Sequence, residues 1–141
     1  MPKTAEKNHA IENALAHLES IRELLARFET AYAKGDDSFE PISEEIAEYP
    51  LSVLVRSPWH SVYERDESIS EYEILLTTGG PALRIRGEVE YGQPTTARLE
   101  WQDWGTPWTE LHPSEYPEGL KPSEADEILK AFASHFYYEE G

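Results

Sequence analysis

The sequence of 141 residues contains no cysteine, a single methionine and far fewer basic than acidic side chains. Without cysteine the chain cannot form disulfides, bind zinc through thiolates or use a thiol nucleophile. No stretch approaches the roughly 18 consecutive apolar residues of a transmembrane helix. The N-terminus also lacks the apolar run of a signal peptide. We therefore expect a soluble, cytoplasmic protein with no membrane partner.

The scarcity of basic residues restricts the partners. Lys and Arg number 12 and Asp and Glu number 28, so the formal net charge is -16. Such a charge repels phosphate backbones and anionic lipids, which argues against direct binding of nucleic acid. Basic protein surfaces are attracted instead. The alternative is that the charge serves only to keep the protein soluble.

The composition nevertheless predicts a folded chain. Hydrophobic residues make up 39% of the sequence and aromatic residues 11%, which is too much apolar material for a disordered acidic tail. The length is close to that of one ordinary domain, roughly 100 to 150 residues. We expect residues 1–141 to form a single domain.

Hydrophobic spacing predicts helices at both ends of the chain. Apolar residues recur at three- and four-residue steps over residues 5–34, with Thr4 as the expected N-cap and Gly35 just beyond the C-terminus. A short helix capped by Ser43 is expected in the acidic segment that follows. The last helix is expected to begin at Ser123 and to continue to Tyr138.

Between these helices the apolar period changes to two, which predicts antiparallel strands near residues 51–56, 71–76, 83–91 and 97–102, with a short fifth strand at 108–111. In the third strand Tyr91 is expected to face the core. Short turns favour a meander, and the amphipathic helices need an apolar surface to cover. The predicted fold is α+β, a four- or five-stranded antiparallel meander with N-terminal and C-terminal helices packed on one face.

Clustered carboxylates are the first candidate for a binding surface. Residues 36–48 hold six acids and no Lys or Arg, and a second acidic group lies in the loop near residue 65. Acids spaced along exposed segments imitate phosphates and attract basic proteins. The predicted partner-binding residues are Asp36, Asp37, Glu40, Glu44, Glu45 and Glu48, with Glu64, Asp66 and Glu67 as the second group. The alternative is that these acids form only a solvated face.

Tryptophans and arginines suggest a different kind of site. Trp108 lies where the chain bends, so it could stack on a ligand or fill the core. Arginines of neighbouring strands should share the sheet face opposite the helices, either as cross-strand pairs with Glu88 and Glu100 or as an anion site. The residues of this alternative ligand site are Trp104, Trp108, Glu110, His112, Arg84, Arg86 and Arg98.

Motifs for catalysis or cofactor binding are weak. Gly79 and Gly80 are an isolated pair without the lysine of a phosphate-binding loop, and no Gly-x-Ser-x-Gly elbow is present. The spacings of His135 with Glu139 and of Glu110 with His112 suit metal ligands, but such spacings arise by chance in so acidic a chain. We predict no metal, no cofactor and no catalytic residue.

Two segments carry a family resemblance. Residues 75–88, Leu-Leu-Thr-Thr-Gly-Gly-Pro-Ala-Leu-Arg-Ile-Arg-Gly-Glu, and the stretch from Leu99 to Trp108 resemble uncharacterised small acidic proteins of bacteriophages, prophages and related bacterial mobile elements. Small acidic phage proteins often occupy host nucleic-acid-binding proteins or defence complexes. The resemblance therefore implies a context of this kind, and it implies no catalytic residue.

Charge and resemblance together predict a non-enzymatic interaction protein that binds a basic surface of a host protein, as a nucleic-acid mimic or as an inhibitor of a host defence complex. The alternative is a small-ligand-binding or enzymatic domain with a pocket lined by Trp, His and Arg. Continuous negative patches would favour the first function, and a pocket joining those three residue types would favour the second.

Overall fold

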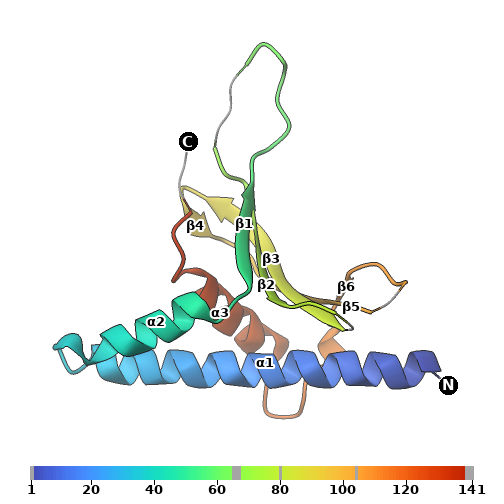
Figure 1. Ribbon diagram of the computed structural model, residues 1–141, viewed down its shortest axis with the longest axis horizontal. Coiled ribbons are helices and arrows are strands. Elements are labelled where there is room, and N and C mark those ends of the chain that lie inside the picture. Colours follow the sequence, from blue (N-terminus) through green and yellow to red (C-terminus); the bar gives the residue numbers. More distant parts are fainter. Residues whose placement is uncertain (1, 65–67, 80, 104, 139–141) are drawn as a thin grey trace.

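A computed structural model shows an antiparallel sheet with helices on one face, which confirms the predicted α+β class (Figure 1). It describes the backbone of residues 2–64, 68–79, 81–103 and 105–138, and side chains from His9 onward. The helices are α1 (Pro2–Tyr32), η1 (Asp37–Phe39), α2 (Glu40–Glu48), η2 (Pro113–Glu115) and α3 (Pro122–Ala133). The strands are β1 (Ser52–Arg56), β2 (Glu71–Thr77), β3 (Ala82–Glu90), β4 (Gln93–Pro94), β5 (Arg98–Gln102) and β6 (Thr109–Glu110).

Proline, and not a hydroxyl cap, stands at the start of each α-helix. α1 begins at Pro2, and the first turns of α2 and α3 contain Pro41 and Pro122. Proline suits this position because its fixed φ is helical and its missing N–H would have no partner there. The predicted caps at Thr4, Ser43 and Ser123 are therefore wrong, because all three residues lie inside their helices.

The strands follow the order β1-β2-β3-β5-β6, and β4 pairs with β3. All pairings are antiparallel, as the meander requires. The expectation for Tyr91 is wrong: it follows β3 in a turn with φ 51° and is 90% exposed. Gly92 continues this turn with φ 74°, so β3 ends at Glu90, one residue earlier than the strand pattern indicates.

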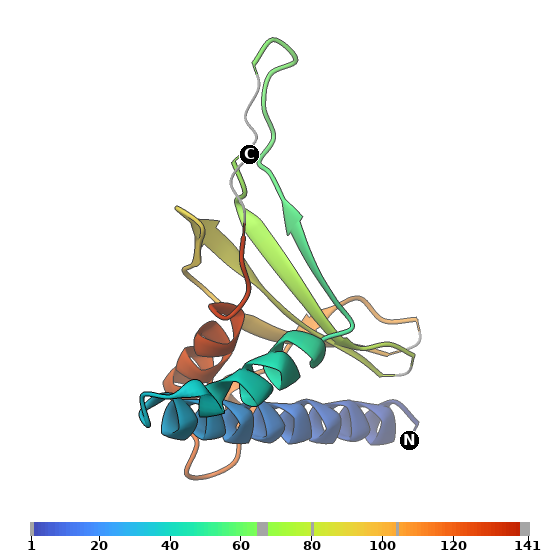
Figure 2. The ribbon, with the colours of Figure 1, turned by 60° about the vertical axis from the view of Figure 1, so that its left-hand side comes forward.

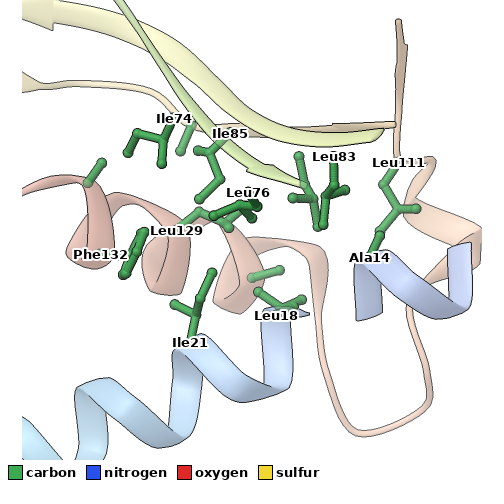
Figure 3. Packing of buried hydrophobic residues seen from close by; sticks show 14 of the residues in the cluster. Ala14, Leu18, Ile21, Ile74, Leu76, Leu83, Ile85, Leu111, Leu129 and Phe132 are labelled. Carbon is green, nitrogen blue, oxygen red and sulfur yellow. The ribbon is translucent and has the colours of Figure 1, made fainter. Parts of the chain in front are cut away.

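One apolar cluster joins the sheet to both long helices (Figure 3). Leu18 and Ile21 of α1 meet Leu129 and Phe132 of α3 beneath the inward-facing residues of β2 and β3, and Phe132 is 0% exposed. The packing of both terminal helices on one sheet face is therefore confirmed. Trp101, which continues the inward alternation of β5, is also in this core.

A long connection between β1 and β2 stands away from the body of the molecule (Figures 1 and 2). We call residues 57–64 the arm. Trp59, Val62 and Tyr63 of the arm are almost completely exposed, at 102%, 90% and 94%. In the part of the chain that the structure describes, no helix combines the length and hydropathy that a membrane-spanning segment needs.

Candidate functional site

The acids of residues 36–48 gather at the end of the molecule where α1 gives way to α2 (Figure 2). Gly35 has φ 75°, a conformation that lets the chain leave α1 without a steric penalty. Asp36 then caps η1 by accepting a hydrogen bond from Ser38 N at 2.9 Å. α2 buries Ile46 against α1 and turns its carboxylates outward. We call the six acids of η1, its cap and α2 the acidic end.

All six acids of the acidic end are exposed. Hydrogen bonds from the Ser38 side chain and backbone lower the pKa of Asp36, so its charge is retained well below neutral pH. Among the ion pairs of the described residues, one involves these acids: Glu45 lies 2.9 Å from Arg27 of α1. The acidic end therefore presents a concentration of negative charge to solvent.

A groove between α1 and α2 extends this surface. It encloses about 430 Å³ and is lined by Glu23, Glu45, Glu48 and Arg27, together with Ser20, Leu24 and Tyr49. Sequence reasoning missed Glu23, which lies far from residues 36–48 in the chain and reaches them only because α2 folds back on α1. Its exposed position on the helix, four residues before Arg27, is the signal that could have identified it.

The second predicted acidic group lies elsewhere. Glu64 is exposed on the arm, at the opposite end of the molecule from α2 (Figure 1). Asp66 and Glu67 lie outside the described residues. Glu64 therefore does not form one continuous surface with the acidic end.

The arginines of the alternative site lie on the sheet face opposite the helices, as the strand pattern predicts. Cross-strand pairs with glutamates form, but mostly with partners other than the predicted ones. Arg84 contacts Glu73 and Glu100, each at 2.7 Å, and Arg86 contacts Glu71 at 3.1 Å. Glu71 also pairs with Arg56 of β1. A network of alternating charges thus covers this face and leaves its arginines compensated.

Trp108 and Arg84 do come together. The Arg84 guanidinium lies 4.1 Å from the centre of the Trp108 ring, a cation–π contact. A shallow hollow of about 600 Å³ beside them is lined further by Glu73, Gln102 and Thr106. Trp104 lies outside the described residues.

Glu110 and His112 do not line the hollow beside Trp108. The ring of His112 accepts a hydrogen bond from Ser114 N at 3.1 Å and so caps η2. Glu110 lies on β6, opposite Glu100 of β5. Arg98 stands 4.0 Å from Glu100 on the same face. The structure thus separates the histidine from the tryptophan and the arginines with which it was grouped.

Within the described residues, no three His, Asp or Glu side chains are arranged to hold a metal ion. The pairing of His135 with Glu139 falls partly on an undescribed residue. Comparisons with family models, with curated proteins and with solved structures found no match to this chain. The resemblance to phage-borne acidic proteins stays a prediction.

Proposed function

We propose that this protein is a non-enzymatic interaction protein whose acidic end binds a basic surface of a partner protein. The observation that carries the proposal is the exposure of all six carboxylates of the acidic end. Four of them lie on α2, which is anchored to the core through Ile46, so their spacing is held before a partner arrives. A preorganised charged surface raises association rates and loses little entropy on binding.

The groove between α1 and α2 suggests how such a partner is held. Three of its lining residues are carboxylates and one is Arg27, which already pairs with Glu45. A lysine or arginine side chain entering the groove would lie between Glu23 and Glu48 and would not need to displace that pair. Partners that bind phosphate backbones present such side chains in rows, so we propose a nucleic-acid-binding host protein. The family resemblance supports a phage or mobile-element origin for the acidic protein itself.

The alternative function, a small-ligand or enzymatic site beside Trp108, has weaker geometric support. Its central cation, Arg84, already bonds two glutamates at 2.7 Å each. An anionic ligand would have to displace one of these carboxylates, and His112 lies outside the hollow. Because the charge of Arg84 is already compensated, we favour the acidic end as the binding site.

The test compares two variants that have equal net charge. One replaces Glu40, Glu44, Glu45 and Glu48 of the acidic end with Gln. The control replaces Glu118, Glu124, Asp126 and Glu127, which are exposed on and before α3, with the matching amides. Binding of a short peptide rich in lysine and arginine is followed by fluorescence anisotropy and stopped flow at low and high salt.

We expect the acidic-end variant to bind at least about tenfold more weakly, to associate more slowly and to lose most of its salt dependence. The control should differ little from the unmodified protein, because its remaining charge includes the whole acidic end. Equal weakening in both variants would show that only the net charge matters. Unchanged binding in the first variant would show that the acidic end is only a solvated surface and does not bind the peptide.

A further inference from the structure

The two edges of the sheet differ in a way that bears on assembly. β6 closes one edge with two residues, Thr109 and Glu110, which is a short and polar strand of the kind that resists pairing. β1 forms the other edge with the sequence Ser-Val-Leu-Val-Arg, and it contains neither Pro nor Lys. Within the described part of the chain, no strand pairs with the outer side of β1. This edge is therefore unprotected.

Exposed apolar side chains concentrate on the same edge. Nine large hydrophobic residues are exposed in the described part of the chain, and six of them fall within residues 51–63: Leu51, Leu54, Val55, Trp59, Val62 and Tyr63. All six lie in one stretch of the chain, which runs from the edge strand into the arm. A concentration of large exposed apolar side chains marks interaction sites in soluble proteins.

The charge of residues 51–63 indicates which molecule pairs with this edge. Residues 51–63 contain no Asp or Glu, in a chain in which 28 of 141 residues are acidic. A symmetric contact places the same surface of both copies face to face, so it must be free of like charges in so acidic a protein. We propose that β1 pairs with β1 of a second copy of this chain across a two-fold axis, forming a continuous antiparallel sheet.

Backbone geometry fits this pairing. Val89 N–H donates to Ser70 O at 2.8 Å, so the even-numbered residues of β2 direct their backbone groups to β3. The odd-numbered residues of β2 then bond the even-numbered residues of β1. Val53 and Val55 are left with N–H and C=O directed outward, which is the arrangement that a further antiparallel strand requires.

The two-fold axis then passes beside Leu54, the middle residue of β1. In this register the two Leu54 side chains oppose one another, Val53 of each copy bonds Val55 of the other, and Arg56 faces Ser52. No like charges are opposed within the paired strands. Because the strands run in opposite directions, the arm of each copy extends past Leu51 of the other.

Electrostatics gives the assembly a distinctive salt dependence. Each copy carries a net charge of -16, so association is opposed at long range although the contact itself is apolar. Salt shortens the Debye length from about 30 Å at 0.01 M to about 3 Å at 1 M and should strengthen the dimer. Binding of a basic peptide at the acidic end should weaken as salt rises. The salt dependence therefore distinguishes dimer formation from peptide binding.

Sedimentation equilibrium of the full chain tests the proposal. We expect a mass twice the 16.1 kDa of one chain, with a dissociation constant that falls as salt rises. Leu54→Lys should raise this constant by about tenfold or more, because it places two ammonium groups on the axis. Tyr137→Lys, at a residue that is 87% exposed outside this edge, is the matched control and should leave the constant unchanged.

Cysteine cross-linking tests the register, since the natural chain has no thiol. Residues opposed in a non-hydrogen-bonded pair have Cα atoms about 4.5 Å apart, which a disulfide spans. Leu54→Cys should therefore cross-link readily under mild oxidation. Val55→Cys should react far more slowly, because its counterpart lies diagonally, about 7 to 8 Å away.

Three outcomes would overturn the proposal. The first is a monomer at all salt concentrations up to about 0.1 mM protein. The second is association that weakens as salt rises, or that Leu54→Lys leaves intact. The third is equal cross-linking of the two cysteine variants. Circular dichroism of each variant establishes that the fold is retained, as the exposure of Leu54 and Val55 leads us to expect.

Discussion

Tyr72 lies across the sheet where Gly87 provides no side chain. The two residues are paired in the register of β2 and β3, and the Tyr72 hydroxyl donates to Thr96 O at 2.7 Å. The ring is 1% exposed and ties β2 to the segment before β5. A Cβ on Gly87 would lie 2.0 Å from Thr96 O and 2.7 Å from the Tyr72 hydroxyl, so glycine is required here for space and not for its φ.

Gly87→Ala should therefore destabilise the domain by about 3 kcal/mol, near the upper end of ordinary overpacking, because one close contact is with backbone. Gly105→Ala is the control: a Cβ there meets no atom within 4 Å, and only its φ of 75° resists substitution. That change should cost about 1 kcal/mol. Urea denaturation measures both, and equal losses would contradict the steric explanation.

Tyr116 should make stability depend on alkaline pH. Burial, reinforced by the carboxylates of Asp126, Glu110 and Glu115, raises the pKa of its hydroxyl to about 12. The unfolded chain loses this proton near pH 10, so between these values the folded state binds more protons. The stabilisation is thus complete below about pH 10 and is lost as the pH rises through about 12.

Urea denaturation at several pH values above about 9 measures this loss. Tyr116→Phe should reduce the slope without abolishing it, because burial also raises the pKa of Tyr72 and Tyr138. Tyr137→Phe, at an exposed position, should leave the slope as it is. An unchanged slope in Tyr116→Phe would contradict the assignment.

At the scale of secondary-structure elements, Arg84 joins three strands on the open sheet face. From β3 it reaches Glu73 of β2 and Glu100 of β5, and its guanidinium lies under Trp108. The residue is 9% exposed, so solvent screens these contacts little. Arg86 makes a comparable pair with Glu71 at 3.1 Å, but its side chain is 31% exposed.

Arg84→Met should therefore destabilise the sheet by about 2 to 4 kcal/mol, because it leaves the partly buried Glu73 without a cation and Glu100 with only Arg98, at 4.0 Å. Arg86→Met should cost less than about 1 kcal/mol, as is usual for a solvated ion pair. Thermal unfolding of the two variants under the same conditions gives the comparison. If the two losses were equal, burial would not be the factor that sets the strength of these pairs.

At the scale of the whole molecule, the charge predicts that the protein does not bind duplex DNA at physiological salt. The net charge is -16, and Arg84, Arg86 and Arg98 each lie within 4.0 Å of a glutamate. These arginines cannot contact phosphates without breaking internal pairs. A gel-shift assay measures this directly. Salt-sensitive binding in the micromolar range would show that the arginine-bearing face acts independently of the net charge.

The spacing of apolar and polar residues in the sequence is sufficient to predict the fold class and the order of the helices and strands. The change from a helical period to alternation near Leu51, and back near Ser123, marks the sheet because each period turns its apolar residues to one side. The prolines at the helix starts are visible in the sequence too, but the nearby Thr and Ser residues match the N-cap preference and so mislead the prediction. Alternation predicts a core position for Tyr91 because it cannot show where a hairpin turns.

By itself the sequence determined the α+β class, the antiparallel meander, the net charge and the exposure of the acids after Gly35, since these follow from local patterns. Only the tertiary structure decided which separated residues meet. It brought Glu23 to the acidic end, paired Arg84 with two glutamates, removed His112 from Trp108 and left β1 as an open apolar edge. The reason is physical: such contacts depend on how helices and strands pack and which strand ends the sheet, and local spacing carries no record of either.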